Sequence, residues 1–352
     1  MSRSHADYTV AWITALSLEL SAGKEMFDEI HEQLAQPPTD TNSYILGSVA
    51  GHNVVMACLP AGVLGITPAA TVVAHLRSTF PRIQFGLLVG IGGGVPSVSK
   101  DIDIRLGDIV VSKPTATYGG VVQYDYGKAM GDGQFQQMGV LNKPPEILLT
   151  SISSYQAGYR REEKPISSLL SKRSSRTSHI FAHPGQGNDQ LFHAAYAHNG
   201  SEANCETCDV KGIIQRKQRD SPEEPMIHYG LIASGNQVIK DATVRDTLAE
   251  RHGIICFEME AAGLMNHLPC LVVRGICDYS DSHKNKRWQG YAAITAAAFA
   301  RLLLSSVPRS SNPRTTETSM YAFILESFRA SNAPVQRTNG PNPKGAACKG
   351  CF

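Results

Sequence analysis

Four acidic residues lie at or beside the ends of apolar, strand-like segments. Glu19 is in "ITALSLELSAG", Glu258 and Glu260 are in "GIICFEMEAAG", and Asp278 is in "VVRGICDYSDSH". A buried acid keeps its proton longer than one in water, because desolvation disfavours the charged form. Such a group is suited to general acid catalysis. Structural explanations also exist, since Glu19 falls in the first turn of a predicted helix and a buried Asp278 could simply accept backbone amides.

A run of glycines follows another apolar segment, in "LLVGIGGGVPS". Gly90, Gly92, Gly93 and Gly94 leave the backbone open to a close ligand and its N–H groups free to bond it. A dinucleotide fingerprint would need G-x-G-x-x-G at the start of a helix, whereas Pro96 follows here. The run therefore indicates either a ligand-binding segment or a plain tight turn at the end of a strand.

These residues must be positioned by an α/β framework. Apolar, β-rich runs predict strands at 8–16, 44–50, 53–59, 85–91, 108–112, 227–234, 254–259 and 270–279. Helical patterns lie between and after them, at 18–34, 66–80, 241–252, 260–267 and 287–305. This alternation predicts helices packed on a mostly parallel or mixed sheet. Ligands of such sheets collect beyond the carboxyl ends of the strands, where the four acids lie.

Residues 128–225 break the pattern, being rich in Ser, Gly, Gln and charge, with short helices expected at 144–158 and 188–197. We interpret them as an elaboration inserted into one catalytic domain, 1–308, because strands resume at Ile227. After Pro308 we expect one amphipathic helix, at 319–330, and otherwise a flexible tail extending to residue 352.

The composition and charge of the chain indicate which kinds of partner and which location to expect. The chain has 352 residues, 42% of them hydrophobic, and a net charge of only +2. Its Lys and Arg residues are scattered, so we expect neither nucleic acid nor a membrane as the main partner. The first residues lack the apolar core of a signal peptide, and no run approaches the roughly 20 apolar residues of a membrane span. We therefore expect an intracellular, cytoplasmic protein.

The eight cysteines fit that expectation. Cys58, Cys256, Cys270 and Cys277 lie in apolar runs, where a free thiol acts as a small hydrophobe. Cys205 and Cys208 form a C-x-x-C pair, as do Cys348 and Cys351 near the end of the chain. Zinc needs four ligands, which His183, His193 or His198 could complete only if the fold brings them in. We favour free thiols and predict no metal and no cofactor.

Taken in order, "ALSLEL", "VGIGGGVP", "IRLGDIVVS", "GLIASGNQVIKD", "FEMEAAG" and "RGICDYSD" resemble the purine nucleoside phosphorylase and uridine phosphorylase superfamily. The likeness is greatest to the methylthioadenosine/adenosylhomocysteine nucleosidase branch and to fungal domains found at the front of immune-receptor-like proteins. It covers about 8–305, apart from the insert. The resemblance implies a three-layer α/β/α fold with a mixed, partly barrel-like sheet, and an enzyme that cleaves the N-glycosidic bond of a nucleoside.

The resemblance also implies roles for the acids. Asp278 matches the residue that protonates N7 of the leaving purine, and Glu260 the one that binds the ribose 2′ and 3′ hydroxyls. Met259 matches an apolar residue against the sugar, and Glu19 the acid that activates the attacking water. Glu258 we assign only to structure, at the turn after its strand.

Further positions match the base and sugar site: Gly92 and Ile91 beside the ribose and base, and Val238 and Ile239 in the base-binding segment. Many relatives have Phe where this chain has Val238. Trp288 has the spacing of an aromatic residue near the base or sugar and could stack in its place, although a tryptophan in a helix is often part of the core.

Hydrolysis is favoured over phosphorolysis. Related phosphorylases bind phosphate through Arg and Ser or Thr, but the matching positions here are Leu88 and Ile91. We therefore expect a purine nucleosidase that uses water, with an adenine base as first choice. The alternatives are a phosphate-dependent purine nucleoside phosphorylase and a non-catalytic, nucleotide-sensing domain. Relatives assemble as dimers or larger rings, so we expect a homo-oligomer.

A basic cluster follows Asp278 in "SDSHKNKRWQG". Lys284, Lys286 and Arg287, with His283 beside them, could bind a 5′-phosphate or polyphosphate, which would make the substrate a nucleotide such as AMP or ATP. They could equally form a solvated basic loop.

Overall fold

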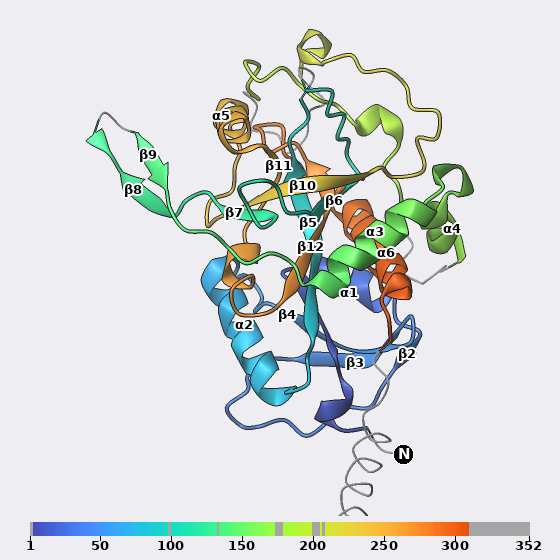
Figure 1. Cartoon of the computed structure of the whole chain (residues 1–352). Coiled ribbons are helices and arrows are strands. Elements are labelled where there is room, and N and C mark those ends of the chain that lie inside the picture. Colours follow the sequence, from blue (N-terminus) through green and yellow to red (C-terminus); the bar gives the residue numbers. More distant parts are fainter. Residues whose placement is uncertain are drawn as a thin grey trace, which may run out of the picture. The chain divides into compact units, whose positions relative to one another are not determined.

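The computed structural model describes residues 3–97, 100–131, 134–172, 179–198, 205 and 208–309. Within these ranges most strands belong to one ten-stranded mixed sheet (Figure 1). Its order is β11 (Ile254–Glu258), β10 (Ile227–Ser234), β6 (Ile109–Ser112), β12 (Cys270–Asp278), β5 (Phe85–Gly94), β1 (Val10–Thr14), β4 (His52–Cys58), β3 (Tyr44–Val49) and β2 (Glu29–Ile30), with β7 (Val121–Gln123) paired to β10.

Part of this sheet closes on itself. β11 pairs in parallel with β10 and also runs antiparallel to the end of β5, where Cys256 and Phe257 face Gly94 and Gly93. β5, β12, β6, β10 and β11 therefore form a closed ring, while β1, β4, β3 and β2 extend from it. The predicted α/β class with a mixed, partly barrel-like sheet is confirmed.

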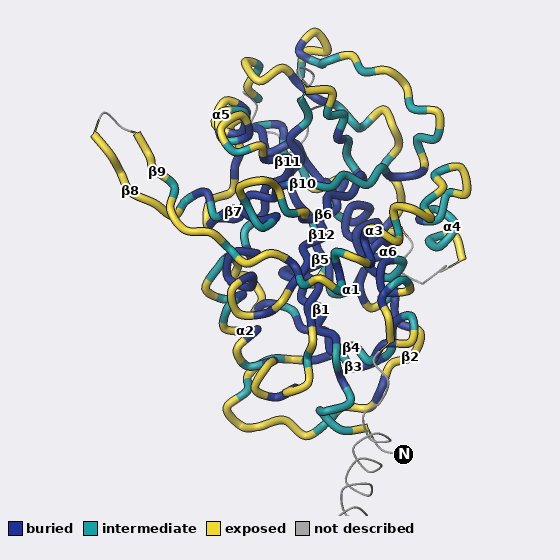
Figure 2. Tube along the Cα trace, in the orientation of Figure 1, coloured by how far each residue is buried: buried dark blue, intermediate teal, exposed yellow. Residues whose placement is uncertain are grey.

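Helices cover the sheet on both faces, because its strands are apolar on both. In β1, Val10 and Trp12 pack into a core with α1 (Ser17–Lys24) and α6 (Gln289–Ser306), whereas Ala11 and Ile13 pack into a second core with α2 (Ile66–Thr79). The buried interior on both sides of the central strands is visible in Figure 2.

Local signals fix the ends of α5 (Ala242–His252). The Asp241 side chain accepts hydrogen bonds from the Thr243 and Val244 amides, at 2.8 and 3.2 Å. Gly253 ends the helix in the left-handed conformation, with φ +77°, which glycine adopts at little cost. The Ala249 and Phe257 side chains then join one core cluster, which seats α5 against β11.

Close packing also places β12. A Cβ on Gly275 would lie 1.8 Å from the Ala292 carbonyl oxygen, so only glycine lets α6 approach the strand here. Ala292, Ala296 and Ala300 are fully buried along α6. The strand that carries Arg274 and Asp278 is thus held directly against a rigid helix.

Several predicted elements differ from the structure. The helix predicted at 18–34 ends at Lys24, because β2 follows and pairs with β3. At 260–267 there is only the 3-10 turn η6 (Ala261–Gly263), and β5 continues through the glycine run to Gly94 instead of ending in a tight turn. The helix predicted at 188–197 is absent, since Phe192 forms a β-bridge with Ile213. The predicted helix at 319–330 lies outside the described residues.

The insert, 128–225, overlaps a projecting hairpin of β8 (Gly127–Ala129) and β9 (Phe135–Gln137) and contains α3 (Glu146–Gly158) and α4 (Pro165–Lys172). Short 3-10 turns complete the described elements: η1 (His5–Asp7), η3 (Arg161–Glu163), η4 (Gln186–Asn188) and η5 (Val210–Gly212). Leu148, Ile152 and Ile166 of the insert pack into the α6 core. Residues 1–308 form one compact unit.

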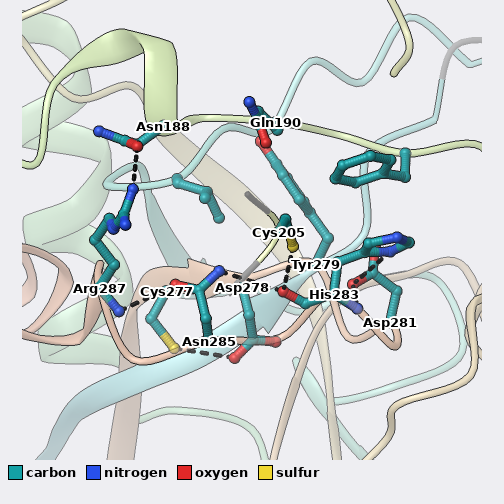
Figure 3. Close-up of a pocket in the computed structure, with 12 residues that line it drawn as sticks. Asn188, Gln190, Cys205, Cys277, Asp278, Tyr279, Asp281, His283, Asn285 and Arg287 are labelled. Atoms are coloured by element: carbon teal, nitrogen blue, oxygen red, sulfur yellow. Dashed lines mark hydrogen bonds and ion pairs between the residues drawn. The ribbon is translucent and has the colours of Figure 1, made fainter. Parts of the chain in front are cut away.

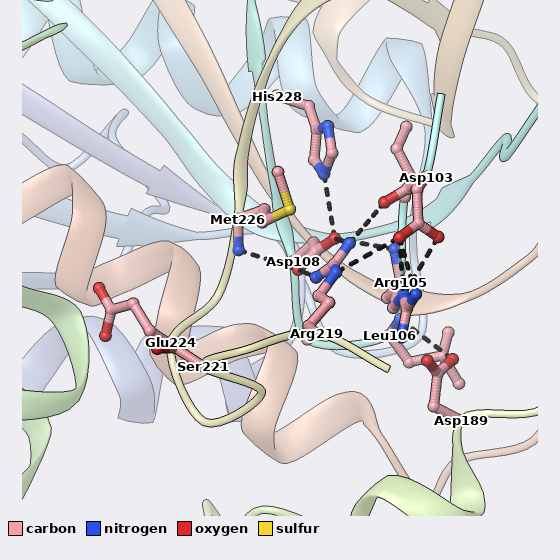
Figure 4. Close-up of polar contacts among 12 residues, drawn as sticks. Asp103, Arg105, Leu106, Asp108, Asp189, Arg219, Ser221, Glu224, Met226 and His228 are labelled. Carbon is pink, nitrogen blue, oxygen red and sulfur yellow. Dashed lines mark hydrogen bonds and ion pairs between the residues drawn. The ribbon is translucent and has the colours of Figure 1, made fainter. Parts of the chain in front are cut away.

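Ion pairs anchor the end of the insert to β6 (Figure 4). The Arg219 guanidinium donates to both oxygens of buried Asp108, at 2.7 and 2.8 Å. His228 Nε2 lies 3.0 Å from the same carboxylate, which also accepts the Met226 and Arg105 amides at 2.9 and 2.8 Å. These contacts lower the pKa of Asp108 to about 2 against the opposing effect of burial.

Within the described ranges, no helix combines the length and the apolar character required to cross a membrane.

Candidate active site

A cavity of about 310 Å³ opens beyond the carboxyl ends of β1, β5 and β11. The acids, aliphatic side chains and two lysines that the sequence assigns to the site largely share this cavity. Its lining includes Glu19, Leu64, Ile91, Gly92, Gly93, Val238, Ile239, Phe257, Glu258, Met259, Glu260, Cys277, Ser280, Lys284, Lys286 and Gln289. Segments more than 200 residues apart in sequence therefore form one site.

Arg274 organises the acids of this cavity. It stands in the middle of β12 and is fully buried. Its Nη2 is paired with Glu258 and lies 3.3 Å from Glu260 Oε2, while its Nη1 lies 3.9 Å from Glu19 Oε1. A buried arginine is tolerated only with charged partners, and here one guanidinium serves three carboxylates. The cluster therefore carries excess negative charge when all three acids are ionised.

Glu19 is held by the backbone at the start of α1. Its Oε2 accepts the Ala15 and Leu16 amides at 2.7 and 3.0 Å, and its Oε1 accepts the Ile91 amide at 2.7 Å. Burial raises the pKa of Glu19, against the opposing effects of Arg274 and these amides. The helix start explains the position of Glu19, but the side chain also lines the cavity, so the two explanations are compatible.

Glu258 and Glu260 have different surroundings although they are two residues apart. Glu258 accepts the Glu260 and Ala261 amides, at 3.1 and 3.0 Å, in addition to its pairing with Arg274. It therefore holds the turn after β11, as the sequence interpretation proposes. Burial raises the pKa of Glu260 to about 7; Arg274 opposes this shift, and the neighbouring Glu258 and Glu19 add to it.

The glycine run makes room for the site's own side chains. A Cβ on Gly90 would lie 2.4 Å from Glu19 Oε1 and 2.5 Å from Arg274 Nη1. A Cβ on Gly93 would lie 2.0 Å from Ser280 Oγ and 2.7 Å from Asp278 Oδ1. Because no larger residue fits, these glycines let the acids and Arg274 meet across β5.

Asp278 lies in the wall behind this cavity. Its neighbours Cys277 and Ser280 line the cavity, while Asp278 itself borders a second, smaller space of about 90 Å³ (Figure 3). Its Oδ1 accepts the Ser280 amide at 2.9 Å, and its Oδ2 lies 2.8 Å from Lys284 Nζ. Burial disfavours the Lys284 ammonium, but Asp278, Cys277 and Asp281 together outweigh this effect, and the pKa of Lys284 is raised.

Two predicted site residues lie elsewhere. Trp288 is 2% exposed, packs edge-on against His183 and Tyr291, and donates from its indole nitrogen to the Asn188 carbonyl at 3.0 Å. It is part of the core and does not line the cavity, so the stacking role suggested for it is not supported. Arg287 is exposed, bonds to Asn188 and lines the smaller space that Asp278 borders, outside the main cavity (Figure 3).

The other three residues of the basic cluster lie in different surroundings. Lys284 and Lys286 line the main cavity, whereas His283 is buried and stacks on Phe192, with ring centroids 3.8 Å apart. Burial lowers the pKa of His283 to about 4, with a further contribution from His198. His283 is therefore no part of a solvated basic loop.

Two residues of the site were not anticipated, the buried Arg274 and the cavity-lining Phe257. Arg274 is the partner of every glutamate in the site, and its only sequence signal is a charge in the middle of an apolar strand, "LVVRGICD". Phe257 lines the cavity and packs edge-on against Tyr124, with centroids 5.7 Å apart. It is an aromatic side chain placed where a planar ring could contact it.

Curated relatives are longer than this chain, and no family model matches it. A nucleotide-binding leucine-rich repeat (NLR)-like protein of Hyaloscypha variabilis is 46% identical over 310 residues, which cover 87% of this chain and 30% of that protein. ATP nucleosidase Cap17 of Escherichia coli is 24% identical over 300 residues, covering 82% and 49%. The chain thus spans less than half the length of each relative.

Solved structures share the fold along most of their length. Futalosine hydrolase of Helicobacter pylori aligns with a TM-score of 0.52 at 16% identity, covering 86% of this chain and 99% of that one. The 5′-methylthioadenosine/S-adenosylhomocysteine nucleosidase of S. pneumoniae has a TM-score of 0.52 at 18% identity, covering 85% and 100%. The chain therefore shares the fold of these nucleosidases, which is the fold that its motifs indicate.

Proposed function

We propose that this chain hydrolyses the N-glycosidic bond of an adenine nucleoside or nucleotide, releasing the free base and ribose or ribose phosphate. The observation that carries the proposal is the convergence of Glu19 and Glu260 on one cavity, with Asp278 paired to Lys284 of its lining. Nucleosidases with this fold, and the relative named as an ATP nucleosidase, support this reaction class.

Glu260 is assigned to the ribose. Its carboxyl group lines the cavity beside Met259 and can accept hydrogen bonds from vicinal hydroxyls. A carboxylate in this place also stabilises the positive charge that develops on the sugar as the bond breaks. Arg274, 3.3 Å away, fixes the orientation of Glu260 without itself lining the cavity.

Glu19 is assigned to the attacking water. Its carboxylate is fixed by the Ala15, Leu16 and Ile91 amides, so it needs no rearrangement to accept a proton. The raised pKa makes it a stronger base than an exposed glutamate. Water held against Glu19 would then attack the anomeric carbon of the bound ribose.

Asp278 is assigned to the leaving base, with a proton delivered to the purine N7. Its Oδ2 is paired with Lys284 in this structure, so that pair must open or shift when a base is bound. Ile239, Val238 and Phe257 supply apolar surface for the purine. In this proposal Phe257, and not Trp288, supplies the aromatic side chain that contacts the base.

Water is favoured over phosphate as the nucleophile. Phosphorolysis requires cationic donors that are free to bind phosphate oxygens. Arg274 is the buried arginine nearest the glutamates, and Glu258, Glu260 and Glu19 surround it. Leu88 is buried in the second core and Ile91 supplies no polar side chain, so neither position offers a phosphate ligand.

The 5′ end of the substrate is assigned to Lys286, with Lys284 as a second cation. Both line the cavity, whereas Arg287 does not. Lys286→Met should raise KM for ATP and leave hydrolysis of adenosine unchanged, with Arg287→Met as the matched control. An equal loss on both substrates would remove the phosphate assignment.

Product analysis with adenosine, inosine, AMP and ATP, each with and without inorganic phosphate, tests the reaction. Free base should appear without phosphate, and faster from adenine than from hypoxanthine substrates. Release that depends on phosphate would make the chain a phosphorylase, and binding without release would make it a sensor. Asp278→Asn should abolish turnover with binding still measurable, while Asp246→Asn, which changes an exposed acid, should not.

A further inference from the structure

A cluster of metal-ligand side chains lies in the insert, outside the proposed substrate cavity. One ligand atom each of His198, Cys205 and Cys208 falls within 4.8 Å of the other two. His198 Nδ1 is 3.1 Å from Cys208 Sγ, and all three residues are half-buried. Of the three histidines that the sequence offers as partners for this pair, only His198 is in place. His183 packs on Trp288 and Tyr291, and His193 is exposed.

The donor set and spacing fit a tetrahedral zinc ion. Zinc takes Cys sulfur at about 2.3 Å and His nitrogen at about 2.0–2.1 Å, so ligand atoms around it lie roughly 3.5 Å apart. His198 Nδ1 and Cys208 Sγ, 3.1 Å apart, are already close to that separation, and the Cys205 sulfur lies within 4.8 Å of both. Two thiolates and an imidazole also select zinc over magnesium or calcium, which prefer oxygen.

We propose that His198, Cys205 and Cys208 bind a structural zinc ion, with His283 as the fourth ligand.

His283 is the candidate for the fourth position because its ring is buried next to the cluster. Its centroid is 5.6 Å from that of His198. Neither ring nitrogen has a hydrogen-bond partner among the described residues, and the nearest carboxylate oxygen, on Asp281, is 3.9 Å from Nδ1. A buried imidazole with both nitrogens unsatisfied is costly. A metal bond to one of them, reached by a small shift of the ring, removes part of that cost.

The zinc site would join the insert to the loop that follows Asp278. The two segments already touch, since the His198 amide donates to Ser282 Oγ at 2.8 Å and the Cys205 thiol donates to the His283 carbonyl at 3.6 Å (Figure 3). Ser280, Lys284 and Lys286 of this loop line the substrate cavity. Zinc would thus fasten the loop that shapes one wall of the proposed active site.

Metal content of the purified full chain tests the site. The protein is produced in zinc-supplemented medium, kept reduced, purified without chelator and analysed by plasma mass spectrometry. We expect about one zinc per chain, falling at least tenfold in Cys205→Ser/Cys208→Ser and in His198→Ala. His193→Ala and Cys58→Ser are the matched controls and should retain the metal. Cobalt substitution should give the intense visible bands of a tetrahedral, thiolate-bound ion.

Chelation tests the site in the unaltered chain, so a variant that fails to fold leaves the proposal testable. Removing the metal should lower the melting temperature, and stoichiometric zinc should restore it. His283→Ala should weaken zinc binding tenfold or more; unchanged affinity would overturn its role as the fourth ligand. A reduced chain that neither contains nor takes up zinc, zinc retained in the double cysteine variant, or a Cys205–Cys208 disulfide in place of metal would overturn the site.

Discussion

Two buried charge clusters in this molecule are built from the same groups in opposite proportions. At the anchor of the insert, one carboxylate, Asp108, is surrounded by Arg219, His228 and backbone amides (Figure 4). In the cavity, one guanidinium, Arg274, is surrounded by Glu258, Glu260 and Glu19. Asp108 is held by an arginine, a histidine ring and two backbone amides, whereas the three glutamates share one arginine.

The ratio of acidic groups to hydrogen-bond donors and cations sets the direction of the pKa shift in each cluster. Hydrogen bonds with His228 and Arg219, together with the Arg219 charge, outweigh burial and lower the pKa of Asp108 to about 2, so its charge is fixed at any physiological pH. Excess acid and burial raise the pKa of Glu260 to about 7, so a proton can come and go near neutrality. The first arrangement suits an anchor and the second suits chemistry, and this is the contrast that the following variants test.

Arg274→Met should have the largest effect. It leaves three buried acids without a cation, and breaking a buried ion pair from one side costs about 3–5 kcal/mol. Denaturant unfolding should show this loss at pH 8 and a smaller one at pH 5, where Glu19 and Glu260, whose pKa values burial raises, take up protons more readily. Arg287→Met, at an exposed site, should cost under about 0.5 kcal/mol. A loss below about 1 kcal/mol for Arg274→Met would mean that the acids do not depend on it.

Asp108→Asn should come next, at about 2–3 kcal/mol near pH 7. The folded pKa of Asp108 lies below its ordinary value of 3.8, so its stabilisation is present above that value and is lost as the pH falls toward about 2. The difference from the native chain should shrink over that window in acid unfolding. Asp103→Asn is the control, because Asp103 also pairs with Arg219 but its side chain is 42% exposed. Equal effects would show that burial does not matter here.

Glu260→Gln should act in the opposite direction. The folded pKa of Glu260 is raised from 4.5 to about 7, so its favourable contribution is complete below 4.5 and is lost as the pH rises to about 7. At pH 8 the neutral variant should be more stable than the native chain, by on the order of 1–3 kcal/mol, and at pH 4.5 the two should agree. Catalysis should fall at both. Glu250→Gln, an exposed acid, should show no such pH dependence; an equal gain in it would contradict the assignment.

Lys284→Met should have the smallest effect on stability, about 1 kcal/mol, because the lysine side chain is 29% exposed and water can replace part of its contact with Asp278. The Asp278–Lys284 pair is intermediate between the two clusters in its charge ratio, because it has one cation for one carboxylate. If Asp278 is the acid of the reaction, the variant should shift the pH–rate profile, whereas Lys286→Met should not. Identical profiles in both variants would separate Lys284 from the chemistry.

Residues at strand ends are the part of the site that could be read from sequence. Glu19 and Glu260 follow apolar runs whose burial nearly dictates a strand, and the ends of parallel strands meet at one edge. Arg274 was missed because its acidic partners lie in two segments distant from it in sequence, so the pairing of its charge is visible only in the folded structure. Trp288 could not be placed from its spacing, because contacts with His183 and Asn188 of the insert turn it into the core. The helix expected at 188–197 failed for a similar reason, since Phe192 pairs with distant Ile213.

The ring of strands closed by β5 and β11 should slow the exchange of its backbone amides with solvent. Cys256 and Phe257 pair across to Gly94 and Gly93 of the glycine run, so Glu258 at the end of β11 stands on backbone with no free edge from which to fray. Exchange of these amides with solvent deuterium should require opening of the whole ring and should be among the slowest in the molecule. The Glu258 carboxylate is then held on backbone that opens only with the ring, where it keeps Arg274 oriented toward the other acids of the cavity.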